Sequence, residues 1–401
     1  MAHLLARQPI YDSFLRVAGY ELLFRPGGLR PTGAFDGDEA TSSVIVNAFL
    51  DRTADQVVGN VPAFINMTPR LLQDGTVELL PKDRVVLEIL ETTEITADLL
   101  AAIRQLHRQG YRFALDDYVG RPDLIPLLDL VDYVKIDVLA LDLAAVEREV
   151  APLLGHRLRL VAEKVETHEV FESCRRLGFT AFQGYFLSRP NIVPGRPVEA
   201  NQMVVVRLLS KIYDPNVTIP QLEELIHLDA TLSYRLLRLV NSAFYNLPRK
   251  LRSIHDALVI LGIRTTKMWV TLISLAGLDE KPADLFSTAM TRAKLCETLA
   301  RRAGVGREDS FFVVGLFSLL DAVLDRPLDV VLADLPLSRD VSDALLHGTG
   351  DLGDALRCAV AFEQADWSKV SFSGLGETPL RESYLEALAW SRGVAAELQQ
   401  A

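Results

Sequence analysis

The sequence predicts a TIM-like (β/α) barrel followed by an all-helical domain. Three observations predict this fold class. Strand-like and amphipathic helical segments alternate over about the first 190 residues, which is typical of a parallel sheet. Polar side chains lie at the ends of the strands that precede helices. After Ser210 few strand candidates remain, and helical periodicity takes over.

The strands of the first half are predicted from short apolar runs bounded by polar residues. Amphipathic segments such as Ala97–Gln109 and His168–Leu177 separate them. The polar groups come from at least six strands, and a closed barrel gathers strand ends on one face, whereas an open doubly wound sheet spreads them along a line. A barrel is therefore the preferred architecture. The predicted strands are Ala63–Met67, Arg84–Ile89, Arg112–Asp116, Tyr133–Asp137, Arg159–Val165 and Ala181–Leu187.

The run Phe113-Ala114-Leu115 leads directly into Asp116 and Asp117. Two adjacent carboxylates repel and raise each other's pKa, an arrangement that a cation between them would relieve. The alternative is an Asp pair that caps the next helix. The other strands end in similar groups, and burying such groups repeatedly is costly unless they are paired or bind metal. These groups are Glu21, Asn66, Glu88, Lys135, Asp137, Glu163 and Gln183.

The segment from Ile192 to Pro197 contains two prolines and a glycine and is a plausible domain boundary. The expected domains are residues 1–195, the barrel, and residues 200–401, the helical domain. Asp229 and Ser253 are expected at or near helix N-caps and Gly262 at a helix end. The predicted helices are Gln221–His227, Thr231–Asn241, Ser253–Leu261, Thr265–Ala276 and Leu285–Ala303.

Composition narrows the class of protein. The chain has 401 residues and a formal net charge of −11, which argues against a surface that coats polymeric DNA or RNA but not against a small phosphorylated ligand held through metal ions. No apolar run reaches the roughly 18–20 residues of a membrane span, and the N-terminus lacks the layout of a signal peptide. Three scattered cysteines have no metal or redox spacing. A cytoplasmic protein without membrane association is expected.

The first half resembles an EAL-type cyclic di-GMP phosphodiesterase domain over roughly residues 3–190. Each motif is weak alone, and the resemblance rests on eight of them in the family's order. Leu22 stands at the middle position of the Glu-Ala-Leu signature, where both residue types are apolar. The motifs are Gln8–Ile10, Glu21–Arg25, Ile65-Asn66, Leu87–Glu91, Asp116-Asp117, Lys135–Asp137, Ala162–Glu166 and Gln183–Tyr185.

The resemblance implies hydrolysis of cyclic di-GMP to linear pGpG and assigns roles to individual residues. Lys135 and Glu163 would act in catalysis, together with Glu21 as a metal ligand. Two Mg²⁺ or Mn²⁺ ions are implied, and oxygen ligands suit both ions. The implied ligands are Glu21, Asn66, Glu88 and Asp116 for the first ion and Asp117 for the second.

The family's remaining contacts map onto five positions. Gln8, Arg25, Gln183 and Glu166 are expected to contact or lie near the bound dinucleotide, and Glu91 is expected to brace the loop that follows Asp117.

This chain departs from the family at two places. The loop from Tyr118 to Asp123 replaces the usual Phe-Gly-Thr/Ala-Gly sequence, which helps to place the second metal and contributes to a dimer contact. Lys164 replaces a small residue and adds a positive charge near the site. The types of metal ligand are retained. The altered loop leaves open whether these ligands keep the geometry needed for two metals and whether the protein forms a homodimer through this loop.

The second half resembles an HDOD domain, a relative of the HD phosphohydrolases without their His-Asp doublet, up to about residue 320. The matching runs include Leu232–Ser242 and Ser253–Ala257. His255-Asp256 is a literal doublet, but it falls where this family carries ordinary polar residues, and we interpret it as a surface pair near a helix N-terminus. This half is therefore expected to bind no catalytic metal and to work by contact with a protein partner or the barrel.

Two functions remain open from the sequence. The first is a metal-dependent phosphodiesterase, favoured because all the acidic ligand positions are retained. The second is a catalytically weak or inactive receptor for cyclic di-GMP that signals through the helical domain, favoured by the altered loop after Asp117.

Overall fold

The computed structural model describes residues 4–25, 57–191, 200–242, 245, 250–278 and 281–400, without the side chains of residues 24, 25, 200, 399 and 400. The chain divides into two compact units. One contains residues 1–189 with 361–370 and 376–381, and the other contains residues 190–360 with 371–375 and 382–401. The boundary segment expected between Ile192 and Pro197 lies outside the described residues.

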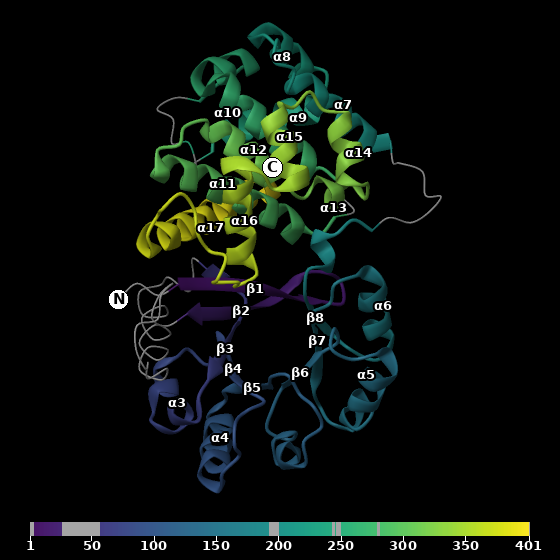
Figure 1. Ribbon diagram of the computed structural model, residues 1–401, viewed down its shortest axis with the longest axis vertical. Helices are drawn as coiled ribbons and strands as arrows, with labels where there is room; N and C mark the ends of the chain where they lie inside the picture. Colours follow the sequence, from purple (N-terminus) through teal and green to yellow (C-terminus); the bar gives the residue numbers. More distant parts are fainter. Residues whose placement is uncertain are drawn as a thin grey trace. The chain divides into compact units, whose positions relative to one another are not determined.

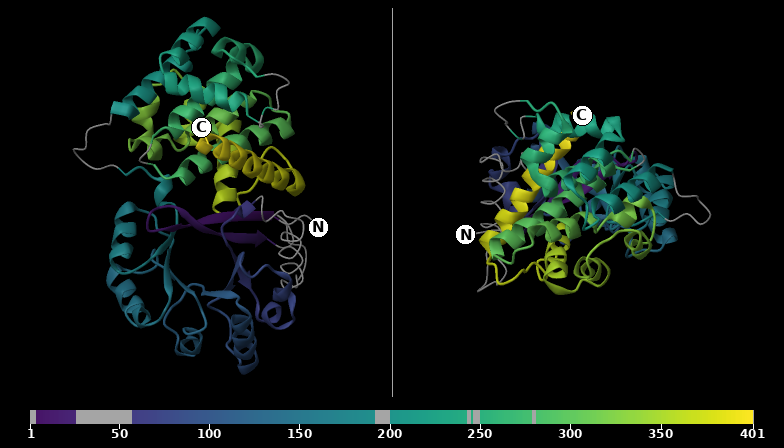
Figure 2. Two further views of the ribbon diagram at one scale, coloured as in Figure 1. Left: turned by 180° about the vertical axis from the view of Figure 1, so that it is seen from behind. Right: turned by 90° about the horizontal axis from the view of Figure 1, so that it is seen from above.

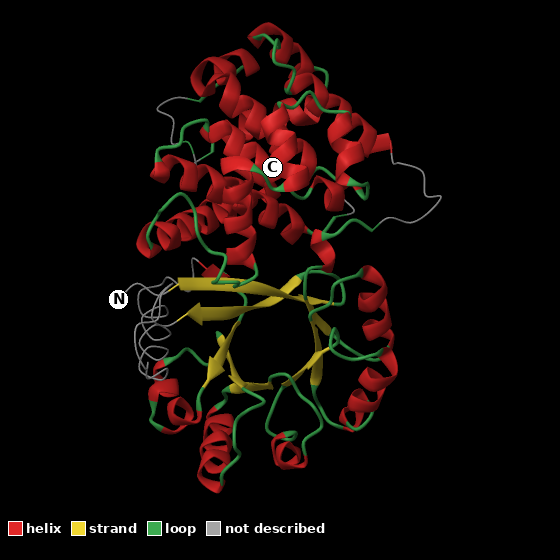
Figure 3. Cartoon of the chain, viewed as in Figure 1, coloured by secondary structure: helices red, strands yellow, loops and turns green. Residues whose placement is uncertain are grey.

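Eight strands of the first unit close into a barrel in chain order (Figure 3). Strand β1 runs antiparallel to both of its neighbours, β2 and β8, and the pairs from β2 to β8 are parallel. The predicted barrel is confirmed, but the antiparallel first strand was not predicted. The strands are β1 (Leu4–Asp12), β2 (Val17–Arg25), β3 (Ala63–Met67), β4 (Val85–Ile89), β5 (Arg112–Leu115), β6 (Tyr133–Asp137), β7 (Arg159–Glu163) and β8 (Ala181–Gln183).

The helices of this unit lie outside the ring of strands, both in the view of Figure 1 and when the chain is seen from behind (Figure 2, left). Local sequence signals set their ends: Thr96 accepts a hydrogen bond from the Leu99 N–H at the start of α4, and Gly110 ends that helix in the left-handed region at φ 96°. The helices are α3 (Pro69–Gln73), α4 (Ala97–Gln109), α5 (Leu143–Val150) and α6 (His168–Arg176), with 3₁₀ turns at Thr76–Leu79, Pro122–Leu127, Leu153–Gly155 and Phe186–Ser188.

A layer of apolar side chains fills the barrel interior: Ile10, Phe64, Val86, Ala114, Tyr133, Val161 and Ala181. Side chains two residues apart on a strand face the same side. On six of these strands, the residue two positions after the apolar residue therefore also faces the barrel interior. On β1, which runs in the opposite direction, the corresponding residue stands two positions before Ile10. Those residues are Asn66, Glu88, Asp116, Lys135, Glu163, Gln183 and Gln8.

Strand β2 has Gly19 at the level of this apolar layer and Glu21 two residues later. A Cβ atom at position 19 would lie 2.7 Å from Phe64 Cε2. The absence of a side chain at Gly19 therefore leaves room for the Phe64 ring. Glu21, two residues later, lies level with the polar residues of the other strands.

The described residues after 199 form helices and turns without strands, as predicted. Their largest core includes Leu209, Leu236, Trp269 and Leu316, all almost completely buried. The helices are α7 (Ala200–Ile212), α8 (Ile219–His227), α9 (Ala230–Val240), α10 (Ile254–Ala276), α11 (Ala283–Ala303), α12 (Glu308–Phe317), α13 (Leu320–Leu324), α14 (Leu328–Ala333), α15 (Arg339–His347), α16 (Gly350–Glu363) and α17 (Glu377–Gln400).

The break that the sequence analysis placed at Gly262 is confirmed, because two helical segments meet at a kink there within α10. Gly262 has non-helical backbone angles, φ 75° and ψ 166°, but the helix resumes immediately after this kink. Among the described helices, α10 is the one whose length and composition would allow it to cross a membrane, which qualifies the expectation that no segment is long enough. One such helix is weak evidence, because the core helix of a soluble protein passes the same test of length and composition.

The ends of α9 and α10 are fixed by side-chain hydrogen bonds. Asp229 accepts from the N–H groups of Thr231 and Leu232, and Ser253 accepts from the Asp256 N–H, so both expected caps are present. The Asn241 amide donates to the Leu251 carbonyl at 2.9 Å and accepts from the Leu251 N–H at 2.7 Å. Asn241 therefore has a structural role, because it joins the end of α9 to the segment that begins α10.

Candidate functional site

The Lys135 ammonium lies at the centre of four acidic side chains inside the barrel. Its Nζ atom is 3.1 Å from Glu21 Oε2, 2.8 Å from Glu88 Oε1, 2.7 Å from Asp116 Oδ1 and 2.8 Å from Glu163 Oε1. Lys135 and Glu88 are fully buried, and the other three are largely buried. The structure thus brings together five of the residues that the sequence singled out.

Sheet register and extra backbone pairing position these groups. Asn66 and Glu88 are direct partners on β3 and β4. Backbone pairing continues past the end of β5, where the Asp116 N–H donates to the Ile89 carbonyl at 3.0 Å and the Tyr118 N–H donates to the Lys135 carbonyl at 2.9 Å. Asp116 is therefore held between β4 and β6, next to Lys135.

A chain of side-chain hydrogen bonds joins β8 to the cluster. The Gln183 amide donates to Glu21 Oε2 at 2.7 Å and to Gln8 Oε1 at 3.0 Å, and the Gln8 amide donates to the Tyr185 hydroxyl at 3.0 Å. Gly184 lies between Gln183 and Tyr185 at φ 147°, and a Cβ atom there would come within 2.1 Å of the Val165 carbonyl oxygen. Only glycine allows this close approach of backbone to backbone.

Burial and the Lys135 charge have opposite effects on the carboxyl groups. Burial raises the pKa of Glu88 well above its usual value, raises that of Asp116, and raises that of Glu163 to about 8. Burial also acts on Glu21, but the Lys135 charge and the hydrogen bond from Gln183 outweigh it, so the pKa of Glu21 is lowered. The surrounding carboxylates raise the pKa of Lys135 well above its usual value despite its burial.

The cluster has the chemistry of a site for hard divalent cations. Its donor set consists of carboxylate and amide oxygens, which suit Mg²⁺ or Mn²⁺. Four carboxylates share one ammonium, so negative charge is in excess when all four are ionised. The buried Asn66 Oδ1, both carboxylate oxygens of Glu88 and the Gln183 Oε1 lack a hydrogen-bond partner, although Glu88 is at ion-pair distance from Lys135. A cation would satisfy these oxygens.

The arrangement around Lys135 differs from a formed metal centre in one respect. Among the described residues, no three His, Cys, Asp or Glu side chains are grouped closely enough to hold one ion by themselves. In this cluster the Lys135 ammonium takes the central position between the carboxylates. The donor types fit a divalent ion, and its binding requires the acidic side chains to shift from the ammonium toward the ion.

Asp117 lies outside this inner cluster, next to a second lysine. Its backbone has a positive φ of 42°, and its carboxylate is 3.9 Å from Lys164 Nζ. Lys164 makes a 2.5 Å ion pair with Asp137. Glu166 pairs with Arg189 at 3.0 Å. Asp117 and Glu166, which were expected near the metals and the ligand, therefore have cationic partners other than Lys135.

The loop after Asp117 is joined to the segment after β4 through Arg121. The Arg121 guanidinium donates to the backbone carbonyls of Glu91 and Thr93 and pairs with Asp123 in its own loop. Sequence analysis expected Glu91 to brace this loop. In the structure the visible link uses the Glu91 backbone carbonyl, and the bracing side chain is Arg121. The Arg25 side chain, expected to contact the ligand, lies outside the described residues.

His255 is a surface residue of the helical half. Its Nδ1 lies 3.0 Å from Glu223, and its side chain is 61% exposed. The placement agrees with the interpretation of His255-Asp256 as a surface pair at the start of α10.

Sequence reasoning missed Tyr185 as a partner of Gln8 and Arg121 as the brace. Tyr185 could have been found from its place two residues after Gln183. No sequence signal connects Arg121 with a backbone carbonyl thirty positions away, because a bond to a main-chain oxygen requires no particular residue type at position 91.

The comparisons with known proteins agree with this architecture. Residues 42–190 match the EAL domain family and residues 200–323 match the HDOD domain family. The EAL match begins after Gln8, Glu21 and Arg25, whose strands nevertheless belong to the barrel. The resemblance inferred from the motifs is confirmed.

Two relatives align along nearly the whole chain. The cyclic di-GMP phosphodiesterase CdgJ of Vibrio cholerae is 35% identical over 398 residues, which is 97% of this chain and 92% of that protein. The uncharacterized protein YuxH of Bacillus subtilis is 33% identical over 397 residues, covering 96% and 97%. Among solved structures, the EAL domain of Mycobacterium smegmatis DcpA is 28% identical, with a TM-score of 0.38, and the match covers 46% of this chain and 91% of that one.

Proposed function

Because the chain belongs to the family that joins an EAL domain to an HDOD domain, we propose that it hydrolyses cyclic di-GMP to linear pGpG in a divalent-metal-dependent reaction. The observation that carries this proposal is the Lys135 cluster. Four carboxylates and the Asn66 amide are directed into one end of the barrel, and burying so many acidic groups is costly without a cationic partner.

The residues present are suited to hold two ions, Mg²⁺ or Mn²⁺. Glu21, Asn66, Glu88 and Asp116 would hold the first, and Asp117 would take part in holding the second. A pair of such ions, when bound, activates a water molecule and stabilises the leaving oxygen of a phosphodiester.

The chain's own side chains orient the reacting groups. Lys135 neutralises part of the acidic cluster and fixes the positions of Glu21 and Asp116 relative to each other. Glu163 shares the same ammonium, and in this proposal it accepts a proton from the attacking water. Water adds to one phosphorus, the P–O3′ bond at that phosphorus breaks, and the leaving 3′-oxygen takes up a proton to give linear pGpG.

Contacts to the dinucleotide are proposed at the rim of this cluster. Gln8 and Gln183 lie in one hydrogen-bonded chain with Glu21, so they could link the ligand's position to that of a metal ligand. Arg25 and Glu166 complete the proposed ligand contacts by family position. Dimerisation through the loop after Asp117 stays a prediction.

A receptor without turnover is the second candidate function. Two features specific to this chain favour it: the loop after Asp117 is held by Arg121, and Lys164 brings a positive charge to Asp117. Either feature could weaken binding of the second ion while leaving the dinucleotide contacts intact.

Product analysis separates the two functions. The full chain is incubated with cyclic di-GMP and either Mg²⁺ or Mn²⁺, and the nucleotides are separated by chromatography. We expect pGpG to form with at least one of the ions and to be absent when a chelator is present. Tight binding of cyclic di-GMP without any product would favour the receptor.

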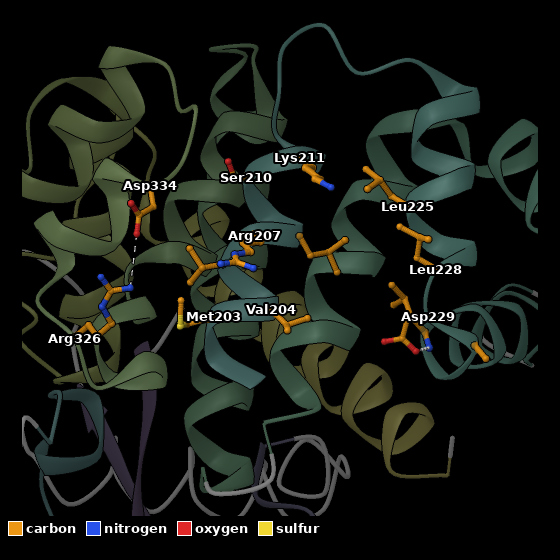
Figure 4. Close-up of a pocket in the computed structure, with 14 residues that line it drawn as sticks. Met203, Val204, Arg207, Ser210, Lys211, Leu225, Leu228, Asp229, Arg326 and Asp334 are labelled. Carbon is orange, nitrogen blue, oxygen red and sulfur yellow. Dashed lines mark hydrogen bonds and ion pairs between the residues drawn. The ribbon is translucent and has the colours of Figure 1, made fainter. Parts of the chain in front are cut away.

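We also propose that the helical half contacts a partner through a groove along α7. This α7 groove has a volume of about 810 Å³ and is lined by Met203, Val204, Val206, Arg207, Leu208, Ser210, Lys211, Leu225, Leu228, Asp229, Ala230, Leu232, Arg326 and Asp334. Figure 4 shows side chains of α7 between Arg326 with Asp334 on one side and Leu225 with Leu228 on the other. Val204 and Leu228 are 62% and 75% exposed.

The charges of the α7 groove indicate the kind of partner. Arg326 is compensated by Asp334 at 3.7 Å, and the Asp229 carboxylate caps α9. With Arg207 and Lys211 the lining has three cations against two carboxylates, so its net charge is positive although the whole chain is acidic. An amphipathic helix with an apolar stripe and acidic flanks fits these features.

A charge reversal tests the α7 groove. We expect a labelled helical peptide with a leucine stripe and glutamate flanks to bind the full chain, and R207E to weaken that binding about tenfold or more because it places like charges together. The control is R238E, a basic position on α9 that does not line the groove. Equal binding by R207E and the parent, or better binding of a lysine-flanked peptide, would contradict this surface.

A further inference from the structure

Lys164 occupies a backbone position that is unfavourable for its side chain. It follows Glu163, the last residue of β7, with a φ of 55° in the left-handed region. That conformation is unfavourable for a residue other than glycine, because the Cβ atom comes close to the backbone carbonyl oxygen. A long charged side chain at such a position calls for a compensating interaction.

The ends of two neighbouring strands provide that interaction. The Lys164 ammonium lies 2.5 Å from Asp137 Oδ2, at the end of β6, and 3.9 Å from Asp117 Oδ1, just after β5. The other Asp137 oxygen accepts hydrogen bonds from the N–H groups of Leu139 and Ala140, so this carboxylate is fixed in place. Lys164 therefore pairs closely with Asp137 and lies at the outer limit of ion-pair distance from Asp117.

We propose that Lys164 is a built-in counter-cation that competes with the second divalent ion for Asp117. This inference rests on the proposed function, which gives Asp117 a share in holding that ion. The ion proposed at Glu21, Asn66, Glu88 and Asp116 then binds tightly, and the ion at Asp117 binds much more weakly. Lys164 thus sets the metal dependence of the site without contacting the substrate, and it is a positioning residue.

Electrostatics determines the direction of the effect. An ammonium and a divalent cation that share one carboxylate repel each other, and the repulsion weakens with distance and with the local dielectric. Because the Lys164 side chain is 53% exposed, solvent screens part of this repulsion. The competition is therefore expected to lower the affinity for the second ion rather than to abolish its binding.

Three substitutions separate charge from backbone effects. K164Q removes the charge and keeps most of the side-chain length. K164R keeps the charge. K164G removes the charge and also relieves the strain of the positive φ.

The experiment is a Mn²⁺ titration of the full-length protein and each variant by calorimetry, with electron paramagnetic resonance at low temperature to detect spin-coupled ion pairs. We expect the parent to bind one Mn²⁺ tightly and a second more weakly. In K164Q and K164G the second affinity should rise about tenfold or more, and the coupled-pair signal should appear at lower Mn²⁺ concentration. K164R should resemble the parent.

Three other results would contradict this inference. Equal second-ion affinity in K164Q and the parent, with the first ion still tight, would overturn the role of Lys164 and leave the proposed function standing. A K164R variant that behaves like K164Q would show that the charge is not responsible. No tight Mn²⁺ in any variant would overturn both this inference and the metal-dependent function.

Discussion

Replacing Glu21 with glutamine is expected to lower hydrolysis of cyclic di-GMP by at least about two powers of ten. Glu21 Oε2 accepts hydrogen bonds from both Lys135 and Gln183, so the carboxylate is fixed in position. The amide has the same shape but no charge, and in either orientation it presents only one oxygen to Lys135, Gln183 and a metal ion. The change is measured as initial rates of pGpG formation with saturating Mg²⁺ and with saturating Mn²⁺.

The matched control is E172Q on the outer helix α6. Glu172 forms an exposed pair with Arg175 at 2.7 Å, so its substitution removes a carboxylate far from the proposed chemistry and should leave the rate near that of the parent. If E21Q formed product as fast as the parent, the metal ligation proposed for Glu21 would be wrong.

Replacing Lys135 with methionine is expected to destabilise the metal-free protein by about 3–5 kcal/mol. The substitution keeps an unbranched side chain in a fully buried position but removes the charge that faces Glu21, Glu88, Asp116 and Glu163. Those carboxyl groups would then be buried beside one another without a cation. Denaturant unfolding of both proteins in the presence of a chelator measures the difference.

Divalent ions provide a second measurement on the same variant. With the ammonium gone, a cation is the remaining group that can offset the acidic cluster, so Mn²⁺ should raise the melting temperature of K135M more than that of the parent. The control is K164M, which also removes a lysine charge but from a half-exposed side chain, and a small change in stability is expected. Equal destabilisation by K135M and K164M would contradict a special role for the buried ammonium.

The acidic cluster therefore links stability to function. Buried carboxyl groups with raised pKa values, such as Glu88 and Glu163, are unfavourable for folding by themselves. Lys135 limits that cost in the metal-free protein. In the proposed function these acidic groups bind cations. That role would explain why polar residues stand at strand positions that are usually apolar.

Local sequence patterns were sufficient for most of the barrel. The strands Ala63–Met67 and Tyr133–Asp137 have the predicted bounds, because short apolar runs between polar residues allow few other structures. The interior position of Asn66 and Glu88 follows from the same pattern, since each stands two residues after an apolar side chain of the inner layer. Strand β1 was missed because its polar residues Arg7 and Gln8 interrupt the apolar run.

The sequence by itself determined the barrel, the helical second half and the set of polar groups at the strand ends, because these depend on periodicity and on residue type. Only the tertiary structure decided which groups meet. Lys135 pairs with acidic residues from four other strands or strand ends, and Lys164 with Asp117 and Asp137, because sheet closure and register bring positions distant in the chain within ion-pair distance. Pairing across a closed sheet leaves no mark on the sequence around either partner, so no local pattern could have shown it.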